Sequence, residues 1–157
     1  MVNTVGKNIS AVNESYTAGF LDADGAIMAT IERHKEKRYG FRIRVIVKIT
    51  QKNKTIVDWF RTQYSIGNVV HNRATYDWII RDQSDAYSFI KQLEPYIIVK
   101  RKQALIALQI LDHKISSKED LISVALLADT LSSYNVRSKL RRRNYSLMIQ
   151  EVFSRND

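Results

Sequence analysis

The stretch TAGFLDADG, residues 17–25, decides the fold. Small and apolar side chains lead directly into two carboxylates, Asp22 and Asp24. Gly19 and Ala23 are four residues apart, so on a helix they share one face. Small side chains at that spacing allow a second helix backbone to approach closely. We therefore predict that this face is a helix–helix contact.

A helix is predicted over residues 14–23, with Asn13 or Ser15 as its N-cap and Gly25 at its end. It ends on two acids at the negative pole of its dipole, where each carboxylate is disfavoured by a few tenths to about 1 kcal/mol. A divalent cation, or hydrogen bonds from a packed neighbour, would compensate this placement. The alternative is a plain turn that favours Asp and Gly. An EF-hand does not fit, because its further acidic ligands are missing at the required spacing.

Composition narrows the class of protein. The 157 residues include 25 Lys and Arg against 16 Asp and Glu, a formal net charge of +9, and 45% are hydrophobic. We predict one domain over residues 1–157, with a core at about 14–113 and a helical tail at about 114–157. The absence of cysteine excludes disulfides, thiolate-bound zinc, iron–sulfur clusters and thiol catalysis.

The basic charge favours a polyanionic partner, with nucleic acid ahead of a membrane surface. No apolar run in the sequence approaches the ~18–20 residues that span a bilayer, and the first ten residues lack the apolar core of a secretion signal. We therefore expect an intracellular protein that is not secreted and has no membrane partner.

Hydrophobic periodicity predicts two hairpins. Residues 26–34 and 41–51 alternate between apolar and polar side chains on either side of a polar turn, and residues 67–73 and 75–82 form a shorter pair. In the last segment Tyr76, Trp78 and Ile80 are predicted to face the core, and Asp77, Ile79 and Arg81 to lie outside. Helical patterns cover residues 54–64, 84–94, 99–113, 117–132 and 136–153. The order α-β-β-α-β-β-α predicts an α+β domain: one four-stranded antiparallel sheet, helices on its back and a helical C-terminal tail.

The motif resembles the nine-residue signature of the LAGLIDADG homing endonucleases, and its departures from that signature include Thr17 and Phe20. The resemblance to the single-motif branch of that family covers roughly residues 14–113. Its further elements are Thr50-Gln51-Lys52, Trp59-Phe60, and Leu93-Glu94-Pro95 leading to the run from Lys100 to Ala104.

One copy of the signature implies a homodimer, whereas family members with two copies are longer monomers. The motif helices of two subunits would then pack at a two-fold axis beneath duplex DNA. The residues expected at this contact are Ala18, Gly19, Phe20, Asp22 and Ala23.

The resemblance also implies catalytic roles. Asp24 and the backbone carbonyl of Ala23 would bind Mg²⁺, with Mn²⁺ as a substitute and Ca²⁺ supporting DNA binding without cleavage. Gln51 would orient water, and Lys100 would offset charge on the scissile phosphate. The alternatives are an exposed basic residue for Lys100 and a polar strand end for Gln51. Asp22 is expected to be structural.

The polar face of the hairpins is expected to lie in a DNA groove, where Arg and Lys can read guanine and Asn can read adenine. The predicted strand contacts are Met28, Thr30, Glu32, His34, Arg42, Arg44, Lys48, Asn68, Asn72, Asp77, Ile79 and Arg81. The basic tail is predicted to hold phosphates through Arg137, Lys139, Arg141, Arg142 and Arg143, or else to be an exposed tail that does not bind.

The function implied is a site-specific endonuclease of the intron-homing type that hydrolyses both strands of a long, near-palindromic duplex. Two alternatives stay open on the same fold: an RNA maturase that binds its host intron RNA, and a DNA-binding protein that has lost catalysis. Such genes lie in organellar or archaeal introns, so expression in a mitochondrion, a chloroplast or an archaeal cytoplasm is expected.

Overall fold

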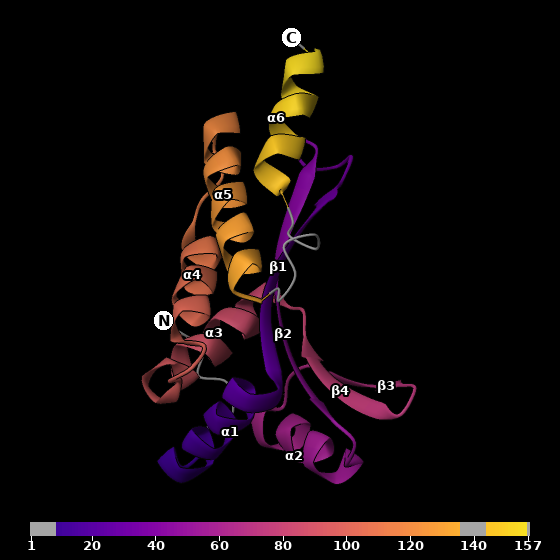
Figure 1. Cartoon of the computed structure of the whole chain (residues 1–157), viewed down its shortest axis with the longest axis vertical. Helices are drawn as coiled ribbons and strands as arrows, with labels where there is room; N and C mark the ends of the chain where they lie inside the picture. Colours follow the sequence, from indigo (N-terminus) through magenta and orange to yellow (C-terminus); the bar gives the residue numbers. More distant parts are fainter. Residues whose placement is uncertain (1–8, 136–143, 157) are drawn as a thin grey trace.

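The computed structural model describes residues 9–135 and 144–156 (Figure 1). The helices are α1 (Ala11–Asp24), α2 (Lys54–Tyr64), α3 (Gln83–Leu93), α4 (Arg101–Asp112), α5 (Lys118–Asn135) and α6 (Tyr145–Asn156), with a short 3-10 turn, η1, at Glu94–Tyr96. The strands are β1 (Gly25–Arg33), β2 (Phe41–Gln51), β3 (Asn68–Asn72) and β4 (Thr75–Ile80). The predicted α+β class and element order are confirmed.

The four strands form one antiparallel sheet in the order β1-β2-β4-β3. Each hairpin pairs internally, and β2 joins the two hairpins by pairing with β4 from Val47↔Ile80 to Gln51↔Tyr76. Where this pairing stops, the Gln83 side chain continues it: its Oε1 accepts from Val45 N at 2.7 Å and its Nε2 donates to Val45 O at 2.9 Å. The amide group satisfies backbone groups that would otherwise be unpaired at the end of the ladder.

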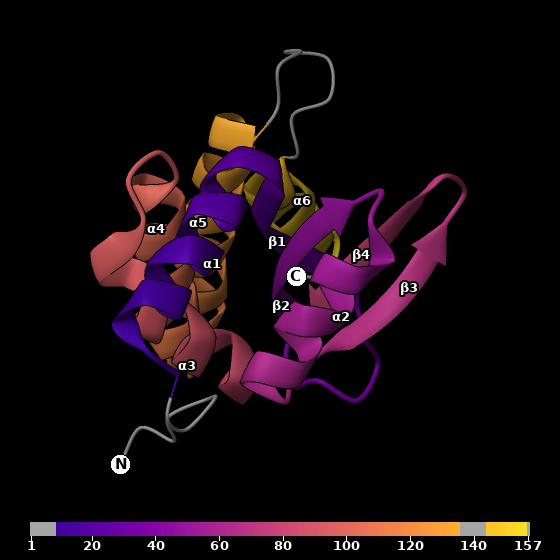
Figure 2. The same cartoon turned by 90° about the horizontal axis from the view of Figure 1, so that it is seen from below.

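The core lies between the sheet and the helices. Ile27, Val45 and Val47 on the back of the sheet are fully buried, as are Phe89 of α3 and Val124 of α5. Helix α5 packs on β1 and α3 packs on β2. Figure 2 shows α3, α4 and α5 grouped on one side of the molecule, while β3 and β4 project on the other. The helices therefore cover the back of the sheet, as expected from the alternation in β1 and β2.

The boundaries of α1 differ from the prediction. The helix begins at Ala11, because the Ser10 hydroxyl oxygen accepts from Asn13 N at 3.2 Å and is the N-cap in place of Asn13 or Ser15. It continues to Asp24, and Gly25 passes directly into β1 with φ −99° and ψ 171°. A left-handed glycine cap is therefore not used at this end.

Asp22 ties α1 to α4. Its Oδ2 accepts from the backbone N–H of Ile98 at 2.8 Å and of Val99 at 3.1 Å, and its Oδ1 accepts from Lys100 N at 2.9 Å. Helix α4 has no side-chain cap from its own preceding residue. The carboxylate thus binds the turn that leads into α4, including the N–H of its N-cap residue Lys100, and lies near the positive end of the α4 dipole, which compensates its place at the negative end of α1.

The C-terminal part is held by a second carboxylate. Asp129 of α5 accepts from the backbone N–H of Tyr145 at 2.6 Å and of Ser146 at 3.0 Å, which caps α6. The predicted tail helix 136–153 overlaps α6, and residues 136–143 lie outside the described residues. None of the described helices combines the length and the hydropathy needed to cross a membrane.

Replacing Asp22 by Ala should lower the free energy of unfolding by about 2 kcal/mol, because three backbone N–H groups lose a charged acceptor. Asp58→Ala is the matched control. It removes only the surface ion pair between Asp58 and Lys54, whose side chains are 44% and 55% exposed respectively. The substitution should therefore lower the free energy of unfolding by less than about 1 kcal/mol. Urea unfolding at one fixed protein concentration measures both values. Equal losses in the two variants would contradict the stabilising role of Asp22.

Candidate nucleic-acid interface and catalytic site

The face of the sheet away from the helices, here called the front face, is organised in rows across the strands. One row runs Ala26–Lys48–Ile79–Asn68, and the next is Thr50–Asp77–Val70. Towards the end of the first hairpin the opposed pairs are Met28↔Ile46, Thr30↔Arg44 and Glu32↔Arg42. The strand pairing brings together side chains that the alternation of polar and apolar residues predicts on one surface.

Two predicted contacts on β4 are not exposed. Asp77 is 4% exposed and Ile79 is 7% exposed: both point to the front face, away from the core, as predicted, but neither is exposed there. Since β4 is an inner strand between β2 and β3, side chains on both sides cover its front face. Arg81, which follows the end of β4, is exposed as expected.

Asp77 holds its neighbours instead of presenting a free acceptor. Its Oδ1 accepts from the Thr50 hydroxyl at 2.6 Å, and its Oδ2 lies 3.7 Å from the Lys48 ammonium. Burying a carboxylate is unfavourable unless it has an ion-pair partner and a hydrogen-bond donor, and Asp77 has both in Lys48 and Thr50. Asp77 therefore positions Lys48, whose side chain is 32% exposed and can reach a ligand.

Glu32 and Arg42 form a second ion pair on the front face, within the chain itself. Arg42 Nε donates to Glu32 Oε1 at 2.7 Å, and the Arg42 Nη2 contacts the same oxygen. The guanidinium of Arg42 holds the pKa of the Glu32 carboxyl below its usual range. Both side chains remain partly exposed, so a base that binds here competes with their mutual contact.

The other predicted strand contacts differ in how far their side chains are exposed. Asn68 and Asn72 are exposed, and Met28, Thr30 and Arg44 are half-buried. His34 does not lie with them. Strand β1 ends one residue earlier, the alternation stops, and the imidazole lines a pocket beside α6.

Two further front-face residues, Thr50 and Val70, were not among the predicted contacts. Thr50 bonds Asp77, and Val70 is 41% exposed opposite Asp77. The alternation of residues 68–72 already places Val70 on the face of Asn68 and Asn72, so the signal for Val70 was present in the sequence. The predicted phosphate contacts Arg137, Lys139, Arg141, Arg142 and Arg143 lie outside the described residues.

The predicted catalytic residues gather at the C-terminal end of α1. Gln51, the last residue of β2, donates its Nε2 to Asp24 Oδ2 at 2.5 Å. Lys100 donates its ammonium to the backbone carbonyl of Asp22 in the last turn of the same helix. Ala23 is exposed between the two acids. Three segments far apart in the sequence therefore meet at one point.

The donor set at this point suits a hard divalent cation. Asp24 is exposed, and its Oδ1 has no hydrogen bond from the described residues. Carbonyl groups of the last helical turn, including that of Ala23, have no intrahelical partner. In residues 9–135 and 144–156 no group of three or more His, Asp or Glu could hold a metal ion. Mg²⁺ needs no such cage, because it keeps several waters and binds through one or two carboxylates together with a substrate phosphate.

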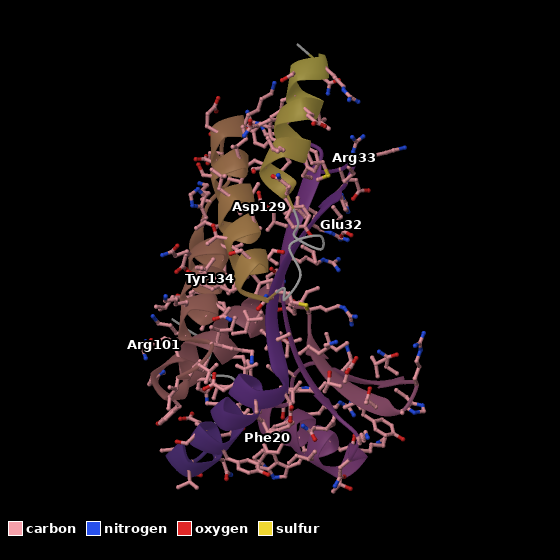
Figure 3. The ribbon with its side chains drawn as sticks, in the orientation of Figure 1. Phe20, Glu32, Arg33, Arg101, Asp129 and Tyr134 are labelled. Atoms are coloured by element: carbon pink, nitrogen blue, oxygen red, sulfur yellow. The ribbon has the colours of Figure 1, made fainter. Side chains whose placement is uncertain are left out.

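The outer face of α1 carries an apolar surface. Val12 is 75% exposed and Tyr16 is 48% exposed. Together with Phe20, Ile56 and Trp59 they border a groove of about 690 Å³ between α1 and α2. Figure 3 places Phe20 at this end of the molecule. Rings here pack edge to face, with 5.5 Å between the centroids of Tyr16 and Trp59.

Two residues of the motif differ in what they offer a partner. Ala18 is 0% exposed in the chain itself, so its side chain has no surface left for the helix–helix contact in which it was expected. Gly19 is exposed, and a Cβ atom built on it would meet no atom within 4 Å. Nothing within this chain therefore requires a glycine at position 19.

Known proteins resemble this chain along most of its length. A family model described as LAGLIDADG endonuclease matches residues 17–110. DNA endonuclease I-CreI of Chlamydomonas reinhardtii is 28% identical over 132 residues, which cover 81% of this chain and 80% of the relative. DNA endonuclease I-CvuI of Chlorella vulgaris is 27% identical over 144 residues, which cover 82% and 89%.

The crystal structure of I-CvuI in complex with DNA has the same fold, with a TM-score of 0.82 and 24% identity over 92% of this chain and 94% of that chain. The matched residues 17–110 are more than half of the chain and hold the C-terminal part of α1 with the motif, the whole sheet and most of α4. The chain belongs to the LAGLIDADG endonuclease family.

Proposed function

We propose that this protein is a site-specific DNA endonuclease of the intron-homing type, which uses Mg²⁺ to hydrolyse both strands of a long, near-palindromic duplex. The observation that carries the proposal is the meeting of Asp24, Gln51 and Lys100 at the end of α1, beside a basic front face. The names of the relatives I-CreI and I-CvuI, both DNA endonucleases, support the same reaction.

Each of the three residues has a task that its contacts allow. Asp24 offers its free carboxylate oxygen to the metal, and the Gln51 amide fixes the orientation of the other oxygen. The Lys100 ammonium uses one of its three N–H groups on the Asp22 carbonyl, which leaves two for a phosphate oxygen. Mg²⁺, when bound, would stabilise charge on the phosphate and lower the pKa of an attacking water.

The front face fits a long duplex site. Strand β1 has 9 residues and spans about 30 Å at about 3.3 Å per residue. At about 3.4 Å per base pair, one subunit would follow about 9 base pairs. Two subunits related by a two-fold axis would read about 18–20 base pairs as a near-palindrome.

The homodimer is proposed to form through the outer face of α1. Val12, Tyr16 and Gly19 lie on this face, and the absence of a side chain at Gly19 would let a second backbone approach. Ile98 and Val99, which are 83% and 72% exposed beside Asp22, extend the apolar surface. An exposed apolar patch of this kind marks an interaction site. The two copies of Asp24 would then lie near the axis, one for each DNA strand.

Asp24→Asn should lower the cleavage rate at least about 100-fold, because the amide keeps the size of the side chain and loses the charge that binds the metal. Duplex sites enriched from a random library are the substrate, with cleavage measured in Mg²⁺ and binding measured in Ca²⁺. Binding should stay within about threefold of wild type, since the front face is unchanged. Asp58→Asn, on the outside of α2, is the control and should cleave normally. Cleavage by the Asp24→Asn variant at the wild-type rate would contradict the assignment of Asp24 as a metal ligand.

Gly19→Leu should convert the dimer to a monomer, because the larger side chain separates the two α1 helices. The helix itself should tolerate the change, since Leu favours helix over Gly by up to about 1 kcal/mol. Sedimentation gives the mass, and circular dichroism confirms the helix content. Ser123→Leu, an exposed change on α5, should leave the dimer intact. A dimeric Gly19→Leu variant would place the interface elsewhere.

A further inference from the structure

A pocket lies at the opposite end of the molecule from the motif helix, where the β1–β2 hairpin meets α6. Its volume is about 560 Å³, which is within the range of small-molecule sites. Its walls come from the end of β1, the hairpin turn, the first residue of α5 and the outer half of α6. Figure 3 places Arg33 at this end of the long axis and Phe20 at the other.

The pocket is strongly basic. Arg33, Lys35, Arg38 and Lys118 line it, and no Asp or Glu is among the described residues that do so. A concave surface of one charge sign concentrates the opposite ion, and guanidinium groups bind phosphate oxygens in pairs. His34 lines the same pocket, and its Nδ1 is buried with no hydrogen-bond partner among the described residues.

The pocket also presents aromatic rings. The Arg38 guanidinium lies 5.4 Å from the Tyr39 ring centroid, and the Lys118 ammonium lies 4.9 Å from that of Phe153. Phe153 packs edge to face on Phe41. Cations beside aromatic faces are typical of surfaces that bind single strands, because unpaired bases stack on the rings while cations hold the backbone. A duplex keeps its bases paired and cannot offer them to such rings.

The pocket is separate from the front face. Arg33 pairs with Phe41 across the hairpin, and Phe41 belongs to the core side of β2, whereas Glu32 and Arg42 lie on the front. The turn between them is fixed, because the Tyr39 hydroxyl donates to Ser116 O at 2.5 Å. The sheet therefore stands between the pocket and a duplex bound on the front face.

We propose that this pocket binds one nucleotide of a single-stranded polynucleotide. Arg33 and Arg38 hold its phosphate, and the base stacks on Phe153. RNA and DNA share this chemistry, so either could be the source of the strand.

The test measures binding of labelled single strands of about 16 nucleotides, one RNA and one DNA of the same sequence, to the full-length protein at fixed salt. The variant Arg33→Ala/Arg38→Ala should bind at least about tenfold more weakly. Phe153→Leu keeps the apolar packing and should lose about fivefold or more through stacking. The control Arg61→Ala/Lys91→Ala removes the same charge from exposed sites outside the pocket, and should lose less than about twofold.

Three results would overturn the proposal. The first is an equal loss in the pocket and control variants, which would mean a general charge effect. The second is displacement of the single strand by duplex DNA in a one-to-one manner, which would place both on the front face. The third is no binding of either strand by the wild-type protein. Stronger binding of RNA than of DNA would support the proposal and add a 2′-hydroxyl contact to it.

Discussion

The rest of the structure depends on the contact of the Asp22 carboxylate with three backbone N–H groups in the turn directly before α4. A helix that ends in acids is unfavourable on its own, and a helix that begins without a cap is unfavourable too. Placing the two ends together satisfies both. The same contact holds Lys100 against the last turn of α1, so a structural interaction also builds the cluster that we propose as the site for metal and phosphate.

The two acids of the motif, Asp22 and Asp24, are separated by a single residue but have different environments, and these environments separate their roles. Asp22 accepts three hydrogen bonds within the chain, whereas Asp24 accepts one, from Gln51, and remains exposed. A carboxylate whose lone pairs are already used supports the fold, and a carboxylate with a free oxygen can bind a metal ion. The sequence alone ranks the two acids by resemblance, while the hydrogen bonds give the physical reason for the ranking.

Two basic side chains of the front face are held in place by carboxylates of the same face. Lys48 is held by Asp77, and Arg42 is held by Glu32, before any DNA binds. Such pairs cost little on a partly exposed surface and reduce the rotamer freedom that binding would otherwise remove. If Lys48 and Arg42 contact bases, as we propose, a base that replaces the carboxylate must make equally good hydrogen bonds, and a wrong base that cannot do so is penalised. Charge at the far end of the first hairpin, by contrast, faces the helices and surrounds the pocket beside α6.

The sequence determined the element order, the alternation of the first hairpin and the identity of the motif, because local spacing decides which side chains share a face. It also named Asp24, Gln51 and Lys100 through resemblance. It could not determine the burial of Asp77 and Ile79, since exposure on an inner strand depends on the pairing of β4 with β2 and β3. Three further features were decided only by the tertiary structure: the burial of Ala18, the hydrogen bonds of Asp22 and the pocket that His34 lines. Each of them joins segments whose contact no local sequence pattern encodes.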